Sequence, residues 1–263
     1  MSETPVTGRW TPADRGAAPA WRATLAQAAM ELRLTTRRAE NLLVTLVIPA
    51  VLLIFFGFVQ VLPDSPARPI DFLLPGVIGL SVISTSLVSL GIATGYERAY
   101  GVLKRLGGSP LPRWGLVAAK MIAVVAVELL QLALLVTIAV VVFGWAPGAG
   151  ASLIVVAVAL PLGTLAFAGI GLLMAGTLKA EATLAGANGL FLLLLLLGGV
   201  VVPVDRLPPL LADIARVLPA AALSDAVRIG LGMDVGNPLG SLALLGAWGI
   251  ATAGLAARWF RWE

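Results

Sequence analysis

The most prominent pattern in the chain is a series of long apolar runs separated by short polar segments. A helix needs about 20 mostly apolar residues to cross a hydrocarbon core of about 30 Å. Runs of this length predict six transmembrane helices, at approximately 41–62, 72–95, 115–144, 151–177, 183–204 and 239–258. The pattern therefore predicts an all-α integral membrane protein.

Composition supports this fold class and narrows the chemistry. The 263 residues are 59% hydrophobic and only 12% charged, whereas a soluble domain carries about 25% charged residues. The chain contains no Cys and no His. Disulfides, thiolate metal sites and catalytic sets built on histidine are therefore excluded, and we expect no catalytic residues and no metal site.

The unequal distribution of Lys and Arg between the two sides of these spans predicts the orientation of the chain. One side holds only four of the 18 Lys and Arg residues, namely Arg68, Arg206, Arg216 and Arg228. The positive-inside rule assigns the other, cation-rich side to the cytoplasm. Both termini and the loop at 96–114 are therefore predicted to be cytoplasmic.

Two N-terminal segments precede the first span. Residues 1–19 are rich in Pro, Gly, Ala and charge, which predicts a disordered cytoplasmic tail. Residues 20–40 place apolar side chains at helical spacing, with the arginines largely elsewhere on the helix. This pattern favours a helix in the membrane interface with its cations toward anionic headgroups. A cytosolic helix before the first span is the alternative.

The connector at 203–238 predicts two short amphipathic helices on the outer face before the last span. Apolar residues recur every three or four positions from Leu207 to Leu218, and Pro219 then ends the first helix. Together the helices would form a lid or a partly re-entrant element. Asp225 and Arg228 are three residues apart and can pair on a helix surface, and an ordinary ion pair that fixes the loop is the favoured interpretation.

A strongly charged segment follows the second span. Glu97 would lie in the first turn of a short cytoplasmic helix over 96–106, and Lys104 and Arg105 in its last turn, which suits the helix dipole. Gly101 would lie inside this helix at a cost of about 1 kcal/mol relative to alanine. Close approach of another protein's surface would explain the glycine, and a solvated loop with a tolerated glycine is the alternative.

Glu128 and Gln131 are the clearest polar candidates inside the membrane. Glu128 lies about 12 residues into the third span, roughly 18 Å deep, where a charged side chain costs at least about 2.5 kcal/mol. The pair would line a translocation path or a dimer seam and bind a cationic part of a substrate, or Glu128 is protonated or paired and locks helix packing. Ser84 and Asn188 are further path candidates, although such residues more often serve close helix contact.

The charged segment also carries a motif. The run Tyr96-Glu97-Arg98, then Gly101 and Leu103-Lys104-Arg105, resembles the cytoplasmic coupling helix of type-2 ABC exporter permeases, and a Ser-Pro turn follows it as in that family. Tyr100 departs from the small or acidic residue expected there. Residues 20–40 look like the N-terminal elbow of the family. The resemblance implies that the ATPase-coupling residues are Tyr96, Glu97, Arg98, Gly101, Leu103, Lys104 and Arg105.

The resemblance implies a permease subunit in a bacterial cytoplasmic membrane that pairs with a second permease chain, either a copy or a close paralogue. A separate nucleotide-binding ATPase subunit would hold ATP and magnesium. The residues agree on one point, because no Lys is followed by Ser or Thr and the phosphate-binding loop G-x-x-x-x-G-K-[ST] is therefore absent. No cofactor and no nucleic acid is expected on this chain. The short external loops favour an amphiphilic drug-like or lipid-like cargo.

Other functions make different demands on the sequence. A secondary transporter driven by an ion gradient would favour internal repeats and several intramembrane carboxylates, and the chain has one deep carboxylate and no convincing repeat. A membrane-embedded enzyme would need acid–base and nucleophilic groups that are missing here. A membrane anchor would not require an organised cytoplasmic helix. An exporter permease is therefore the leading hypothesis.

Overall fold

The computed structural model describes residues 19–37, 39–59, 68–109, 111–199 and 203–260. Within these ranges every regular element is a helix, which confirms the all-α prediction. The elements are α1 Ala20–Arg37, α2 Ala39–Phe58, α3 Pro69–Ile83, η1 Ser84–Ser89, α4 Leu90–Ala99, α5 Val102–Gly107, α6 Arg113–Phe143, α7 Leu153–Thr177, α8 Ala180–Leu197, η2 Val204–Arg206, α9 Pro209–Val217, α10 Pro219–Gly230 and α11 Leu239–Trp259.

Five helical stretches in the described part of the chain are long and apolar enough to cross a membrane. They are Pro69–Ala99, Trp114–Phe143, Leu153–Thr177, Ala180–Leu197 and Leu239–Trp259. The predicted first span corresponds to α2, whose apolar part Thr45–Phe58 is shorter, and the end of that predicted span lies outside the described residues. The predicted disordered tail also lies outside them, apart from residue 19.

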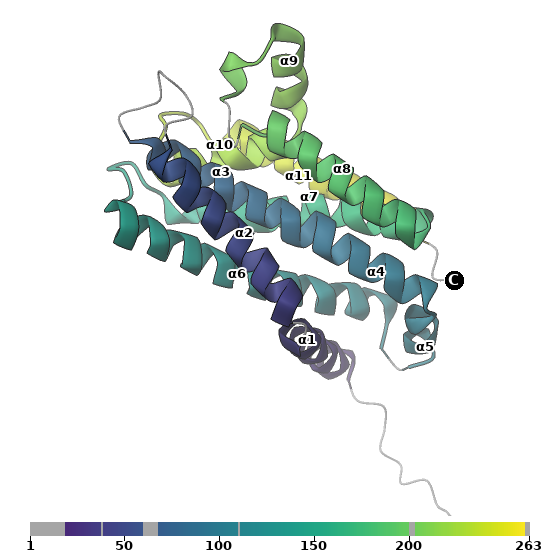
Figure 1. Ribbon diagram of the computed structural model, residues 1–263. Coiled ribbons are helices and arrows are strands. Elements are labelled where there is room, and N and C mark those ends of the chain that lie inside the picture. Colours follow the sequence, from purple (N-terminus) through teal and green to yellow (C-terminus); the bar gives the residue numbers. More distant parts are fainter. Residues whose placement is uncertain (1–18, 38, 60–67, 110, 200–202, 261–263) are drawn as a thin grey trace, which may run out of the picture.

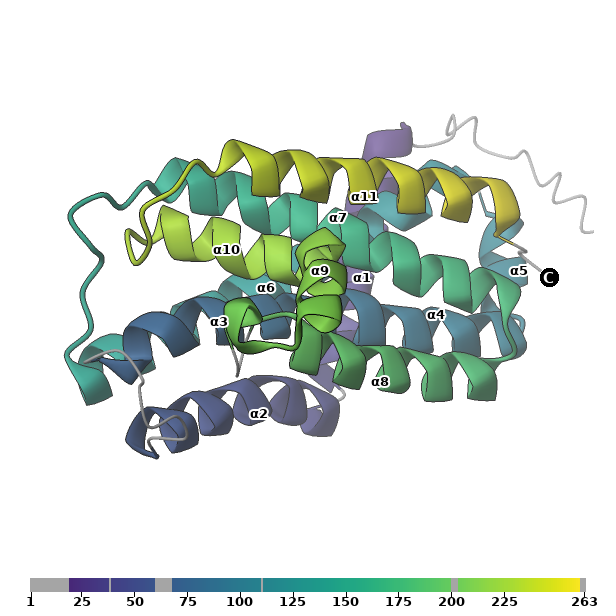
Figure 2. The ribbon, with the colours of Figure 1, turned by 90° about the horizontal axis from the view of Figure 1, so that it is seen from above.

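Most of the long helices run along one common direction, whereas α1 and α9 do not (Figures 1 and 2). α1 crosses the bundle and packs on α6, while α9 projects from the face of the bundle. The end of α4, helix α5 and the turn between α7 and α8 lie together at one end of the bundle. The C-terminal end of α2, the N-terminal end of α3 and the connection from α6 to α7 lie at the opposite end.

A single long helix forms the centre of the bundle. α3, η1 and α4 continue into one another from Pro69 to Ala99, and 83% of the most apolar stretch of this helix is buried. Its middle, η1, is a π-helical turn. Such turns are rare in proteins as a whole, and many of those that occur lie at functional sites. α7 packs so closely on η1 that a Cβ at Gly171 would lie 2.7 Å from the carbonyl oxygen of Leu87.

The predicted fifth span was wrong at its C-terminal end. The sequence predicted a helix to residue 204, but α8 ends at Leu197. Gly198 donates its N–H to Leu194 O over 2.7 Å, and Gly199 follows with φ +67°. That left-handed conformation costs glycine little and ends a helix in the manner of a glycine cap.

The connector before the last span contains the 3₁₀ turn η2 and two α-helices, α9 and α10, and the two α-helices have different environments. α9 is largely exposed and projects outward. α10 is buried along most of its length between α3, α7 and α11. Trp248 of α11 holds the joint between them by donating its Nε1–H to Val217 O over 2.9 Å. α10 is therefore an inserted helix and part of the core, with Leu223 fully buried.

Candidate functional site

The predicted helix over 96–106 is wrong as a single element. α4 ends at Ala99, and α5 begins only at Val102. Gly101 lies between them with φ +69°, a left-handed conformation that glycine adopts without the penalty paid by other residues. The backbone therefore accounts for this glycine without any close contact, because no atom lies within 4 Å of the position that a Cβ would take.

This geometry gives a test of the turn. Replacing Gly101 with alanine places an L side chain in the left-handed region, at a cost of roughly 1–2 kcal/mol. We expect amide hydrogen exchange in α5 to become roughly 5- to 30-fold faster, since 1–2 kcal/mol changes an opening equilibrium by that factor. Gly107→Ala is the matched control, because Gly107 also has open space at its Cβ but lies in α5 without a positive φ. Equal exchange rates in the two variants would contradict the assignment.

The segment from Tyr96 to Arg105 has two parts. We call Tyr100–Arg105, which contains the exposed side chains, the tip, and the less exposed end of α4 before it the root. Lys104 and Arg105 are exposed, and Tyr100 is 73% exposed with its ring stacked on that of Tyr96, 6.0 Å between centroids. Leu103 is buried at 1% exposure, so it anchors α5 and does not reach outward. The root is formed by the half-buried residues Tyr96, Glu97 and Arg98, and Gly101 within the tip is also half-buried.

A buried ion cluster joins the root of this segment to two other helices. Lys120 of α6 is 5% exposed, and its Nζ lies 2.7 Å from Glu97 Oε2 on α4 and 3.2 Å from Glu31 Oε1 on α1. Gln27 donates to the same Glu31 oxygen over 2.9 Å. Sequence reasoning missed this cluster, although one signal was present, since Lys120 is the only cation inside the predicted third span.

Arg98 ties the same root to the turn between α7 and α8. Its Nη2 donates to the backbone oxygen of Leu178, 80 residues further along the chain. The carbonyl of Leu178 lies just beyond the C-terminus of α7, where a helix leaves its last carbonyls without backbone partners. The end of α4 is thus fixed to α1, α6 and the α7–α8 turn by charged side chains.

Glu128 and Gln131 lie in the bundle interior, but they face different helices. Glu128 is 7% exposed, and its Oε2 is hydrogen-bonded to Thr164 Oγ1 of α7. Gln131 is 2% exposed, accepts from Thr85 Oγ1 of η1 over 3.0 Å, and donates its Nε2–H to Thr45 O of α2 over 3.0 Å. Each side chain therefore cross-links α6 to its neighbours.

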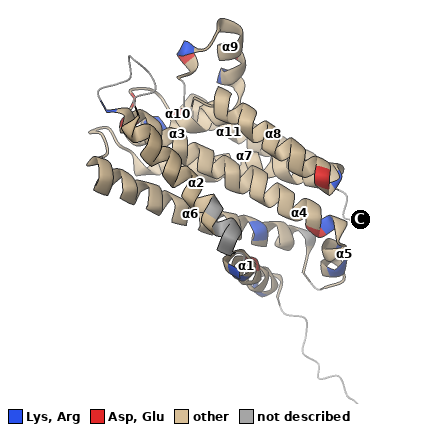
Figure 3. Ribbon diagram, viewed as in Figure 1, with Lys and Arg blue, Asp and Glu red and all other residues tan. Residues whose placement is uncertain are grey.

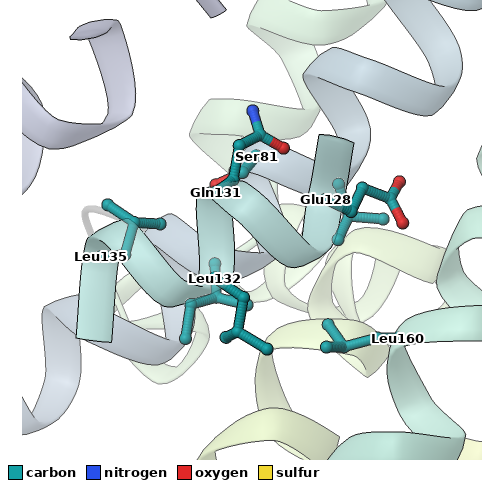
Figure 4. Close-up of a pocket in the computed structure, with 8 residues that line it drawn as sticks. Ser81, Glu128, Gln131, Leu132, Leu135 and Leu160 are labelled. Atoms are coloured by element: carbon teal, nitrogen blue, oxygen red, sulfur yellow. The ribbon is translucent and has the colours of Figure 1, made fainter. Parts of the chain in front are cut away.

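A small cavity lies beside these two residues, with room for about one water molecule. Figure 4 shows the polar ends of Gln131 and Glu128 at separate positions, with Leu132 and Leu160 below them in this view. Its lining comes from α3, α6 and α7, namely Ile78, Ser81, Val82, Glu128, Gln131, Leu132, Leu135 and Leu160. A cavity of this size in this conformation is too small for an organic cargo.

The other two path candidates are not part of this interior site. Ser84 is half-buried at the first position of η1. Asn188 is exposed on α8 and donates to Leu184 O of its own helix over 2.8 Å. Neither residue lines the cavity beside Glu128, so the structure does not bring the four predicted path residues together.

The predicted pair Asp225 and Arg228 forms near the end of α10. Arg228 Nη1 lies 3.1 Å from Asp225 Oδ1, and Nη2 donates to Gly199 O over 3.3 Å. The guanidinium lies over the ring of Phe72 of α3, 4.5 Å from its centroid. Burial raises the pKa of Asp225, and Arg228 opposes this shift; burial lowers the pKa of Arg228, and Asp225 opposes that. The pair fixes α10 to α3 and to the end of α8.

These features define a multi-pass, all-helical membrane protein with a charged tip at one end of its central helix. A search of curated proteins finds no match. The family model for the ABC-2 type transporter matches residues 23–231, and the chain belongs to this family, which confirms the resemblance to type-2 ABC permeases. It is therefore a membrane transporter permease, from a family of membrane subunits of transporters.

Proposed function

We propose that this chain is the membrane-spanning permease subunit of an ATP-driven exporter, coupled to a separate ATPase subunit through the tip formed by Tyr100–Arg105. One observation carries the proposal. The exposed tip follows directly on the buried central helix, and the end of that helix at Glu97 and Arg98 is fixed to α1, α6 and the α7–α8 turn. A displacement of the tip would therefore be transmitted to the central helix, and Gly101 would be the flexible position along the way.

The proposed membrane arrangement has six spans, with α2 as the first and both termini in the cytoplasm of a bacterium. Charged residues support this orientation, since they gather at the α5 end, along α1 and around α9, with long uncharged stretches between (Figure 3). α1 crosses the bundle direction and exposes Trp21 and Leu25, while Arg22 lies 5.1 Å from the Trp21 ring centroid. An amphipathic helix in this position suits the membrane interface.

A second permease chain would complete the translocation path. α8 supports this part of the proposal, because its exposed face combines Asn188 with large apolar residues such as Leu192, Leu193 and Leu196. A polar side chain facing lipid is costly, and a partner helix would remove that cost. The cargo is an amphiphilic drug-like or lipid-like molecule, which can enter such a path from the bilayer.

The experiment reverses the charge of the exposed tip. Lys104→Glu with Arg105→Glu should abolish co-purification with the proposed ATPase subunit, and should lower ATP-dependent transport tenfold or more, the equivalent of about 1.4 kcal/mol. The matched control is Lys104→Arg with Arg105→Lys, which keeps both charges. Arg216→Glu, on the exposed α9, controls for charge reversal elsewhere.

Two outcomes would contradict the proposal. Unchanged ATPase binding and transport in the charge-reversed variant would show that the tip is not the docking element. Transport that stops on collapse of the ion gradient and continues without ATP would identify a secondary transporter instead. Both assays need the chain in membranes together with its ATPase, because the coupling is a property of the complex.

A further inference from the structure

The contacts of Thr164 carry information about the proton of Glu128. Thr164 Oγ1 lies 2.5 Å from Glu128 Oε2 and 2.9 Å from Leu160 O, the carbonyl one turn earlier in α7. A threonine hydroxyl has one hydrogen to donate and two lone pairs to accept with. An ionised carboxylate and a carbonyl oxygen can both only accept. An ionised Glu128 would therefore make two acceptors share one hydrogen.

A neutral Glu128 removes this conflict. The acid hydroxyl then donates to Thr164 Oγ1, and Thr164 donates its own hydrogen to Leu160 O. Both oxygen–oxygen distances suit O–H···O bonds. The second oxygen of the acid, Oε1, is buried without a hydrogen-bond partner among the described residues. A carbonyl oxygen tolerates this position better than a carboxylate oxygen, because leaving a buried charged group unsatisfied costs more than leaving a neutral one.

The surroundings of Glu128 offer no compensating charge among the described residues. α6 packs against α1, α2, α3, η1 and α7, and α7 and η1 contain no titratable residue. Lys120, about two turns earlier in α6, is held by Glu31 and Glu97. The remaining titratable residues of α6 and of the helices packed on it lie near helix ends or in α1, namely Arg22, Arg33, Arg37, Glu40, Asp71 and Arg113. The adjacent cavity holds about one water molecule, which is too little space for a hydrated cation.

We infer that Glu128 is a proton-binding site inside the membrane, a neutral carboxylic acid that donates to Thr164 and joins α6 to α7. The ligand of this site is a proton. Separation of α6 from α7 would break the hydrogen bond and admit water, and the acid would then release its proton. In the packed conformation the site presents no negative charge to a cationic cargo. The inference holds independently of the proposed exporter function.

Infrared spectroscopy of the full chain in lipid membranes tests the inference directly. In the difference between the wild type and Glu128→Gln at pH 7, we expect the loss of one carbonyl band of a protonated carboxylic acid, and this band should shift in D₂O. Loss of carboxylate bands instead would overturn the inference. Glu181→Gln is the matched control, because Glu181 is exposed at the start of α8 and should lose carboxylate bands.

A second variant keeps the acid in place and tests the hydrogen bond. Thr164→Val has nearly the shape of threonine but removes the acceptor. We expect the carbonyl band assigned to Glu128 to move to a different frequency, because the acid loses its partner. An unmoved band would overturn the assignment of Thr164 as acceptor. This variant also decides the question if Glu128→Gln fails to fold, since an acid band that responds to position 164 identifies Glu128.

Discussion

Replacing Lys120 with methionine is expected to destabilise the protein by about 2–4 kcal/mol. Removing one partner of a buried ion pair typically costs 3–5 kcal/mol, and partial exposure of the carboxylates of Glu31 and Glu97, at 14% and 22%, lowers that figure. Glu97 Oε2 has no described partner besides Lys120, so methionine would leave this oxygen buried and unpaired. Thermal unfolding in detergent, followed by the fluorescence of the seven tryptophans, measures the loss.

The controls separate charge from shape. Lys120→Arg keeps the charge and should lose much less stability than Lys120→Met. Adding Glu97→Gln to Lys120→Met removes one of the unpaired carboxylates and should recover part of the loss, because interactions of neighbouring residues are not additive. If the change in unfolding free energy of the double variant equals the sum of the changes in Lys120→Met and Glu97→Gln, Lys120 and Glu97 do not interact in the folded protein.

The same cluster makes a functional prediction that stability alone does not test. Lys120 connects the root of the coupling tip to α1 and α6, so a stable variant without this connection should bind the ATPase normally. The amount of cargo transported per ATP hydrolysed should fall below that of the wild type. This result would separate the proposed docking through Lys104 and Arg105 from transmission through the end of α4.

The sequence predicted those parts of the fold that follow from length and hydrophobicity. Four of the apolar helices both begin and end within a few residues of the predicted boundaries, as in Trp114–Phe143 against 115–144 and Leu239–Trp259 against 239–258. Local backbone conformation was harder to predict. Gly101 was assigned to a helix interior and Gly199 to a span, but both have a positive φ, which composition and periodicity do not reveal.

Contacts between distant segments account for the rest of the difference. Glu31, Glu97 and Lys120 come from three separate helices, and their spacing along the chain carries no signal that they meet. Glu128 was recognised because a carboxylate is conspicuous in an apolar run, but its partner Thr164 lies 36 residues away. α10 was predicted as an amphipathic helix on the outer face. In the structure most of its residues are buried in the core, and Arg228 near its C-terminal end lies over the ring of Phe72. One sequence does not specify which helices are neighbours.

The close contact between α7 and the central helix predicts a large effect from a single methyl group. A Cβ at Gly171 would lie 2.7 Å from Leu87 O and 3.2 Å from Ser86 O, both backbone atoms of η1. Backbone cannot move aside as a flexible side chain can, so Gly171→Ala forces α7 away from η1. Overpacking in a core costs about 1–3 kcal/mol, and we expect the upper part of this range in thermal unfolding.

Gly254→Ala in α11 is the matched control, because no atom lies within 4 Å of its Cβ position. The same methyl group there should leave stability unchanged or raise it by up to about 1 kcal/mol, the usual gain from glycine to alanine within a helix. The contrast removes helix propensity from the comparison and leaves only the contact with η1. Equal stability of the two variants would mean that α7 does not lie against the carbonyls of η1. If α7 can be displaced without loss of stability, then η1 is not a rigid link between the exposed tip and the interior of the bundle.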